Sequence, residues 1–269
     1  ITGVSSRLQN PRRLLLDSVN DRLFVANSGS ILIFDNASTL AANAAPSRVI
    51  SGSQTGLSAP VDLALDSSAD QLYVADGSSI LVFANASTAN NNTAPVRSFN
   101  LAVNIGAILL DTNNDQLFVA DPADDIVDVL GNASLQNIIG QPTALIAGID
   151  TGLSGPNGLA LDASNRLIVS NSRPPVSLTV YPSASTANGD VLTVATIDGG
   201  STQLTAPSQI LLNQDVNNGE LYVIDSASGS ILVFSGLNVA NGNLAPTRVI
   251  TSTSLPANSI AGMALDITR

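Results

Sequence analysis

The stretch that decides the fold is Pro60-Val-Asp-Leu-Ala-Leu-Asp66, followed by Gln71-Leu-Tyr-Val-Ala-Asp76 and Ile80-Leu-Val-Phe83. These short apolar runs, separated by turns of Ser, Ala, Asp and Gly, predict three consecutive β-strands. The first run returns along the chain, ending at residues 17, 66, 111, 162, 213 and 266, with spacings of 49, 45, 51, 51 and 53 residues. A period of about 40–50 residues that contains several strands is typical of a propeller blade.

Each repeat continues, after a polar loop, into a fourth and shorter run. The fourth strands are expected at Arg48–Ile50, Arg97–Phe99, Leu145–Ala147, Leu192–Thr196 and Arg248–Ile250. The first and second runs are almost wholly apolar, which predicts buried inner strands, whereas the fourth carries Arg, which suits an exposed edge. No stretch shows a sustained helical period. We therefore expect an all-β fold, a single β-propeller domain over residues 1–269 built from four-stranded antiparallel blades.

The two ends of the chain suggest how the ring closes. Residues 1–17 align without a gap to residues 50–66, so the sequence contains six first, five second, five third and six fourth strands. This count predicts a six-bladed propeller of five full repeats plus terminal strands, whose closing blade lacks its two middle strands. Three explanations stay open: cleavage after Arg269, further sequence beyond it, or strands donated by another chain. Unpaired strand edges beside such a gap would favour self-association.

Composition excludes much chemistry. The chain has 269 residues, 10 Lys+Arg against 21 Asp+Glu and a net charge of −11; all ten cations are Arg, and Lys, His, Cys and Trp are absent. His general bases, Lys Schiff bases, Cys nucleophiles, disulfides and Cys/His zinc sites are therefore impossible. The acidic balance argues against nucleic acid and anionic membranes as partners, and no apolar run is long enough to span a membrane.

Low charge and abundant Asn, Ser, Thr and Ala suggest a secreted or cell-surface protein. Four Asn-x-Ser/Thr sequons, at Asn36, Asn85, Asn91 and Asn132, would accept glycans in a host with the machinery. The alternative is that Asn-Ala-Ser is a turn preference copied with the repeat.

The repeated acids favour a structural interpretation. Asp17, Asp66, Asp111, Asp162 and Asp266 close the first strand of their repeats, and a residue present in every repeat more often caps a turn than binds a ligand. A second set, Asn27, Asp76, Asp121, Asn171 and Asp225, receives the same interpretation. The dense acids Asp121, Asp124, Asp125 and Asp128 are unique to the third repeat, and we expect a solvated acidic loop there rather than a calcium site.

A ligand site should break the symmetry near the start of the innermost strands. The residues there that do so are Arg13, Asp62, Asn157 and Gln209. The arginines Arg48, Arg97 and Arg248 of the fourth strands either form a carboxylate-binding stripe or protect an exposed edge. We expect the second.

The motif Pro156-Asn-Gly-Leu-Ala-Leu-Asp162, followed by Arg166-Leu-Ile-Val-Ser-Asn171, resembles the NHL-type propeller repeat. The longer pattern of Asn-Ala-Ser-Thr, Ala-Pro-x-Arg and Thr-Gly-Leu-Ser-x-Pro resembles bacterial secreted propellers of no assigned activity. The architecture is also similar to six-bladed lactonases of the gluconolactonase type, whose resemblance implies a calcium held by acidic and amide ligands. Here that site would offer only Asp62, Asn157 and Gln209, a poor set for calcium.

The sequence thus favours a non-catalytic, extracellular or cell-surface propeller with a structural, adhesive or protein-interaction role and no cofactor. Its partner would be another protein or a second copy, and it would self-assemble into a filament or lattice through its open blade. The alternative is a calcium-dependent lactonase-type hydrolase or small-molecule binder.

Overall fold

The computed structural model of the chain describes residues 1–135, 141–214, 219–236, 240–252 and 257–266. These residues form twenty strands and five short 3-10 helices, and no α-helix occurs among them. The strands are β1 (Arg13–Asp17), β2 (Arg22–Asn27), β3 (Ser30–Asp35), β4 (Arg48–Ile50), β5 (Pro60–Asp66), β6 (Gln71–Asp76), β7 (Ser79–Ala84), β8 (Arg97–Asn100), β9 (Ala107–Asp111), β10 (Gln116–Asp121), β11 (Ile126–Gly131), β12 (Ala144–Ile146), β13 (Pro156–Leu161), β14 (Leu167–Asn171), β15 (Ser177–Tyr181), β16 (Ala195–Asp198), β17 (Pro207–Asn213), β18 (Glu220–Asp225), β19 (Ser230–Ser235) and β20 (Arg248–Thr251). The 3-10 helices are η1 (Val4–Ser6), η2 (Ala37–Thr39), η3 (Ile149–Thr151), η4 (Ala184–Thr186) and η5 (Gly200–Thr202).

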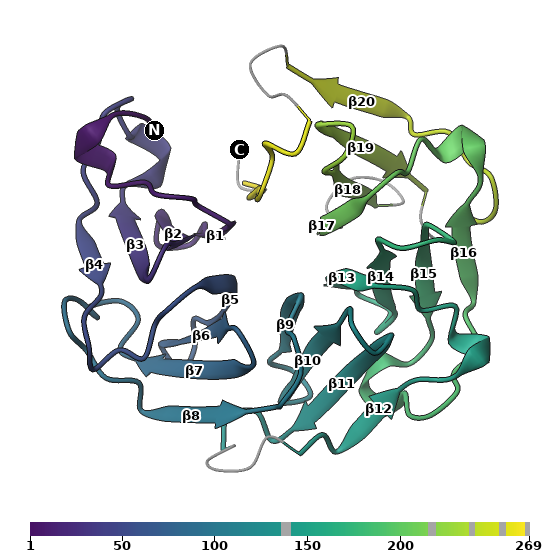
Figure 1. The fold of residues 1–269 in the computed structure, drawn as a ribbon, viewed down its shortest axis with the longest axis horizontal. Coiled ribbons are helices and arrows are strands. Elements are labelled where there is room, and N and C mark those ends of the chain that lie inside the picture. The colour runs from purple at the N-terminus through teal and green to yellow at the C-terminus, as the bar shows by residue number, and fades with distance from the viewer. Residues whose placement is uncertain (136–140, 215–218, 237–239, 253–256, 267–269) are drawn as a thin grey trace. The chain divides into compact units, whose positions relative to one another are not determined.

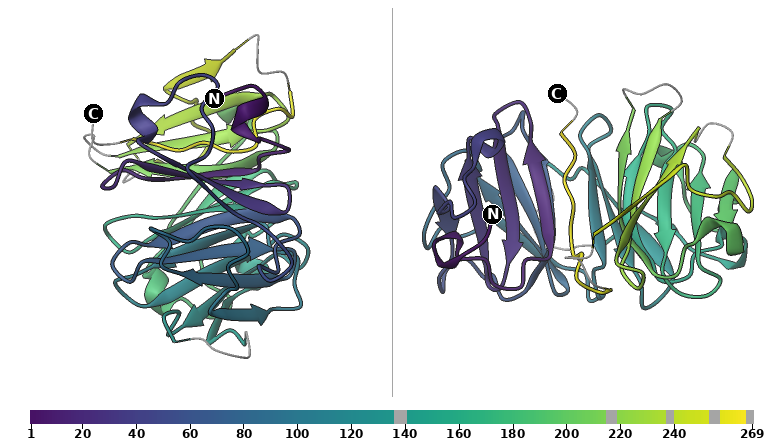
Figure 2. Two further views of the ribbon diagram at one scale, coloured as in Figure 1. Left: turned by 90° about the vertical axis from the view of Figure 1, so that its left-hand side faces the viewer. Right: turned by 90° about the horizontal axis from the view of Figure 1, so that it is seen from above.

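Each run of four strands makes one antiparallel sheet, in which the strands pair in chain order (Figure 1). In the first blade, Asn27 at the end of β2 lies opposite Ser30 at the start of β3. The two-residue turn between them needs a positive φ, which Gly29 supplies at 61°. Figure 2 shows from two further sides that each blade is a twisted sheet of its own. The fold is therefore a β-propeller with four-stranded blades, as expected.

The expected number of blades was wrong, because the structure has five blades and not six. The terminal segments that were to make the sixth form no strand among the described residues: residues 1–6 contain only η1, and residues 257–266 contain no regular element. A first strand gains its hydrogen bonds from the second strand of its own repeat, and the described residues outside the five blades form no second or third strand for the terminal segments.

The five blades fall into two compact units. One holds the first and second blades, and the other holds the third, fourth and fifth. In the first unit, Phe24, Ile33 and Ile50 pack with Leu72 and Phe83 of the next blade. In the second unit, one cluster joins the third and fourth blades and another joins the fourth and fifth. Burial between successive sheets is therefore the main source of stability in each unit.

The middle strands are the most buried ones. β2, β3 and their counterparts are nearly continuous buried runs, whereas residues 14–16 of β1 are only half-buried. The expectation that the first strands are fully buried was thus wrong for β1. The fourth strand of the fourth blade also lies further along the chain than expected, at Ala195–Asp198.

Candidate functional site

The symmetry-breaking residues near the start of the first strands fall in different surroundings. Within the first unit, Arg13 of β1 and Asp62 of β5 are buried, and the Nε atom of Arg13 lies 3.6 Å from the Oδ1 atom of Asp62. In the second unit, Asn157 lies in β13 and Gln209 in β17. The Oε1 atom of Gln209 accepts a hydrogen bond from the Met263 N–H at 2.7 Å. The structure thus brings Arg13 and Asp62 together and ties Gln209 to the main chain.

A metal site would need several carboxylates around one point. Within the described residues no group of three or more Asp or Glu side chains is arranged to hold a metal ion. The proposed channel-mouth ligand site therefore stays a prediction.

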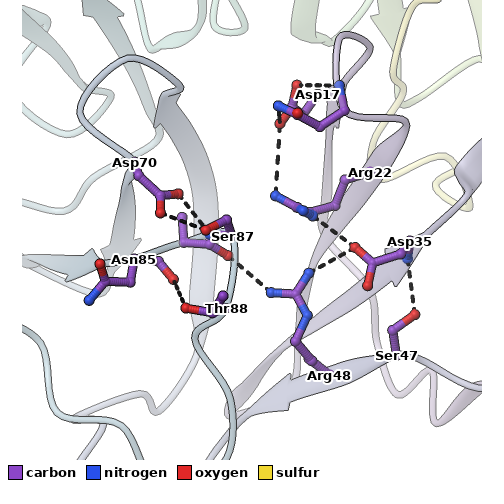
Figure 3. A network of polar contacts seen from close by, with 11 residues as sticks. Asp17, Arg22, Asp35, Ser47, Arg48, Asp70, Asn85, Ser87 and Thr88 are labelled. Carbon is purple, nitrogen blue, oxygen red and sulfur yellow. Dashed lines mark hydrogen bonds and ion pairs between the residues drawn. The ribbon is translucent and has the colours of Figure 1, made fainter.

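A polar network joins the first two blades (Figure 3). Asp35 at the end of β3 accepts hydrogen bonds from the Arg22 Nε and the Arg48 Nη2 atoms, both at 2.8 Å. Burial alone would raise the pKa of Asp35, but the hydrogen bonds and charges of the two guanidinium groups outweigh it and lower the pKa below 3.8. Arg48 also donates to the main-chain oxygen of Ala86 at 3.2 Å. This arginine therefore ties the two blades of the unit together.

Beside the network lies a cavity of about 200 Å³. Its lining residues are Asp17, Asn20, Arg22, Leu65, Ser67, Asp70 and Ser87. The carboxylates on it are already bound within the protein, since Asp17 accepts from the Asn20 amide at 2.8 Å and Asp70 from the Ser87 hydroxyl at 2.6 Å. The polar groups around this cavity therefore stabilise the contact between the first two blades.

The fourth-strand arginines make no free carboxylate-binding stripe. Arg97 donates to Gln71 and lies 5.6 Å from the ring centre of Tyr73, and Arg248 repeats this with Glu220 and Tyr222 at 5.7 Å. Each guanidinium is thus held by the second strand of its own blade, with its stem along the sheet.

Four of the repeated acids cap turns, as expected, and the turn after Asp266 lies outside the described residues. The Asp66 carboxylate accepts the N–H groups of Ser68 and Ala69 at 3.0 and 2.9 Å, and Asp17, Asp111 and Asp162 bind their own turns in the same way. Four members of the second set, Asn27, Asp76, Asn171 and Asp225, bind the loop that enters the blade, whereas Asp121 accepts the Ala123 N–H of its own turn. Asp225, for example, accepts the N–H groups of Thr205 and Ala206.

The sequon asparagines lie on exposed loops. Asn36, Asn85, Asn91 and Asn132 all have positive φ, between 53° and 58°. Ser183 and Gly236, the repeat counterparts of Asn36, Asn85 and Asn132, have positive φ as well. Asn tolerates this conformation better than most residues, so the turn itself accounts for these asparagines. Glycosylation stays a prediction.

A covering loop closes the outer edge of three fourth strands. In the first unit, Asn90 of the second blade accepts the Val49 N–H of β4 at 3.0 Å. Asn91 then makes a parallel bridge, donating to the Val49 carbonyl at 2.6 Å and accepting the Ser51 N–H at 2.9 Å. Asn92 accepts the Gln54 N–H at 2.8 Å. In the second unit, residues 188–190 cover β12 and residues 241–243 cover β16 in the same manner.

Within the second unit, the described residues supply no such cover for the fourth strand of the fifth blade. All four residues of β20 are exposed, with Val249 at 43% and Ile250 at 45%. The counterparts of Ile250 are Ile50, Phe99, Ile146 and Ile197, which are 0–3% exposed. By the repeat, the N–H and carbonyl groups of Val249 point outward, and no described residue of the second unit binds them. β20 is therefore an open sheet edge with an apolar side chain at its centre.

The acids of the third blade do not form the solvated loop that was expected. Asp121 and Asp128 are buried, 1% and 6% exposed, while Asp124 is exposed and Asp125 binds Arg173 and the Gly155 N–H. One carboxylate oxygen of Asp121, Oδ2, is buried without a hydrogen-bond partner. Two buried carboxyl groups thus occur in one blade without a cation.

Sequence reasoning missed Ile250, and it placed Asp128 in a solvated loop. The aligned repeats contain a signal for each residue. For Ile250 the signal is the loop pattern Asn-x-Asn/Asp, which precedes some fourth strands. For Asp128 it is the leucine that other repeats have at this place, namely Leu32, Leu81 and Leu232. Neither signal identifies burial without the sheets in place.

The comparisons with known proteins show similarity in fold alone. The nidogen/laminin complex contains a chain with TM-score 0.66 and 15% identity, covering 93% of this chain and 82% of that one. The Cps50 (Swd1) β-propeller domain of Myceliophteria thermophila matches with TM-score 0.61 and 11% identity over 92% and 73%. Hydrazine synthase of Kuenenia stuttgartiensis matches with TM-score 0.61 and 12% identity over 87% and 65%.

No protein-family model and no curated protein sequence matches the chain. The class is therefore that of a β-propeller, and the likeness to NHL-type repeats stays a resemblance of individual motifs. The structural relatives carry both an enzyme name and the names of protein complexes. No helix within the described residues is long and apolar enough to cross a membrane.

Proposed function

We propose that this protein is a non-catalytic protein-interaction module that binds through the open edge of its fifth blade. The observation that carries the proposal is the exposure of Val249 and Ile250 in β20, where the counterparts of Ile250 in the four other blades are buried. Exposed strand edges pair readily with other chains, and most natural edges are blunted or covered.

The occupant we propose for this edge is a second copy of the chain. Within one chain, three fourth strands of this kind are covered by a loop of the next blade. The loop forms a parallel bridge to the strand, and the isoleucine of the strand is buried in the hydrophobic core. A second copy carries strands and loops of the same repeat, and their pairing with β20 would satisfy the outward groups of Val249. Repeated addition in one direction would give a filament.

The non-catalytic assignment rests on the side chains available. The chain has no His, Lys or Cys, and the Asp62 carboxylate lies beside the Arg13 guanidinium. The sparse charge and the Asn-rich exposed loops support a secreted or surface-displayed protein with a structural or adhesive role, of the kind that NHL-like secreted propellers suggest.

The test is sedimentation velocity of the purified chain between micromolar and submillimolar concentration, with negative-stain images of the same samples. We expect concentration-dependent association of the wild-type protein. Ile250→Glu should abolish it, because a charge would be buried at the centre of the contact. Val249→Pro should weaken it, because proline removes the outward N–H that the covering Asn accepts in the other blades.

The matched control is Ile149→Glu, which charges an isoleucine that is 92% exposed on η3, away from β20. This variant should associate like the wild type. A wild-type chain that stays monomeric over the whole range, or an Ile250→Glu variant that still associates, would refute the proposal.

A further inference from the structure

The cavity between the first two blades differs from its counterparts in the second unit. It has a volume of about 200 Å³, and all its lining residues belong to the first unit. At the same place between the third and fourth blades, the Gln116 side chain donates to the main-chain oxygen of Ser185 at 2.9 Å. Between the fourth and fifth blades, Gln214 binds the Ala163 N–H and the Leu161 carbonyl. A glutamine side chain thus spans each of these two junctions.

Two departures from the repeat leave the cavity open. Arg22 stands where the third blade has Gln116, since each of them pairs with the Asp that closes the first strand of its blade. The side chain of Arg22 turns to Asp35, whose Oδ1 atom accepts the Nε–H at 2.8 Å. Ser67 stands where the fifth blade has Gln214, directly after the first strand, and a serine is much shorter than a glutamine. The symmetry of the repeat is therefore broken here, as expected of a ligand site.

The guanidinium group of Arg22 offers donors to this cavity that the protein does not use. No described residue accepts a hydrogen bond from its Nη1 or Nη2 atom, and Nη1 lies 4.0 Å from the Oδ2 atom of Asp17. The group is held in place by Asp35 and by the ring of Phe24, whose centre lies 6.0 Å from the Arg22 Cζ atom. Donors fixed in this way bind a ligand with little further loss of side-chain entropy.

The two carboxylates of the cavity keep acceptor capacity. Asp17 accepts the main-chain N–H and the side-chain amide of Asn20, at 3.1 and 2.8 Å. Asp70 accepts the N–H and the hydroxyl of Ser87, at 2.7 and 2.6 Å. Each carboxylate oxygen thus takes one hydrogen bond from the described residues and has a second lone pair left. Figure 3 shows the pair of Asp70 and Ser87 across from Arg22.

The charge of the lining decides between ligand classes. Asp17 and Asp70 outnumber the single guanidinium group of Arg22, so an anion would be repelled. A hydroxyl group both donates and accepts, so neighbouring hydroxyls of a neutral ligand can bind the carboxylates and the guanidinium at once. Leu65 adds an apolar surface for C–H groups. The volume lies below the roughly 300–1,000 Å³ of sites for drug-sized ligands, which limits the ligand to about one sugar ring.

We propose that this cavity binds the ring of a neutral hexose, with Arg22 donating to one hydroxyl and Asp17 and Asp70 accepting from others. The site is independent of the open edge of β20, because it lies in the other unit and uses other residues. It is also distinct from the predicted channel-mouth site. Arg13 and Asp62 lie near the start of the first strands, whereas the cavity lies beside the turns at their ends.

The experiment is an NMR titration of the full chain with D-glucose, D-galactose and D-mannose, each from micromolar to submolar concentration. A ligand of this size should bind with a Kd of about a millimolar. We expect at least one hexose to give saturable chemical-shift changes at the main-chain amides of Ser67 and Ser87 and at the Arg22 Nε–H. The uronate of that hexose, which adds a carboxylate to the same ring, should bind more weakly.

A variant that restores the residue of the fifth blade tests the cavity itself. Ser67→Gln should weaken hexose binding by about tenfold or more, because the longer side chain occupies the space of the ring. Since Ser67 is exposed, this variant should keep the wild-type unfolding midpoint. Thr112→Gln is the matched control, because Thr112 is exposed at the same turn position of the third blade. It should bind the hexose like the wild type.

Three results would overturn the proposal. The first is the absence of saturable changes with all of the hexoses, or changes confined to signals other than those of Ser67, Ser87 and Arg22. The second is equal or tighter binding of the uronate, which would indicate an anion site. The third is wild-type affinity in Ser67→Gln. The first two need only the wild-type chain, so they decide the matter even if the variant fails to fold.

Discussion

The fourth strands of the fourth and fifth blades, β16 and β20, have the same place in the repeat and differ in what covers them. On the side of the fourth blade, Ile197 of β16 is 1% exposed and packs with Ile210, Leu221 and Leu232. On the other side, Ile250 of β20 is 45% exposed. The same residue type at the same place in the repeat is thus a core residue in one blade and a surface residue in the next. Its role is set by the neighbouring sheet and not by its own strand.

The closest approach on the covered side gives the largest expected effect. A Cβ atom added to Gly158 of β13 would lie 2.1 Å from the main-chain oxygen of Ser208 in β17. Because backbone atoms on both sides cannot yield cheaply, Gly158→Ala should lower the free energy of unfolding by about 3 kcal/mol or more. Urea denaturation measures this. Gly200→Ala, where an added Cβ meets nothing within 4 Å, should change stability far less, and equal losses would contradict the close contact.

The next test replaces each of the two isoleucines with alanine in a separate variant. Ile197→Ala should cost about 2–4 kcal/mol, because it leaves a cavity between two sheets. Ile250→Ala should cost less than about 1 kcal/mol under dilute, monomeric conditions, because its side chain is already in water. Thermal and urea unfolding of both variants compare the sides, and similar losses would show that β20 is covered in solution.

The covering loop itself has a smaller effect. Asn241→Ala removes the acceptor of the Thr196 N–H, which it binds at 2.9 Å, and should cost about 1–2 kcal/mol. Amide hydrogen exchange at Thr196 should accelerate in the same variant. Asn113→Ala, in an exposed turn, provides the control. Fast exchange at Thr196 already in the wild type would mean that the cover opens readily.

The smallest effect is expected on the open side. Arg248 binds Glu220 and Tyr222 on the surface, where ion pairs contribute little and are screened by salt. Arg248→Ala should leave the unfolding midpoint unchanged within experimental error. A clear loss would indicate that the β20 side is more ordered than its exposure suggests.

The repeat in the sequence was enough to predict the propeller class, the strand order and the turn-capping role of residues such as Asp66. It did not predict the number of blades, because a count of strand-like segments treats residues 263–266 as a strand whether or not a partner strand exists. Strand formation depends on hydrogen bonds to a neighbour. The sites depended on the same missing information: Asp128 is unusual only when its burial is known, and Ile250 only when its cover is seen to be absent.

The strict pairing of each strand with its chain neighbour has a kinetic consequence. Within a blade the paired residues are close in sequence, as with Asn27 and Ser30, so each sheet closes small loops at low entropic cost. Such hairpins form in microseconds, and folding can begin in any blade and spread to the adjacent ones. The exposed strand β20 of the fifth blade should then be the first to fray when the protein is stressed.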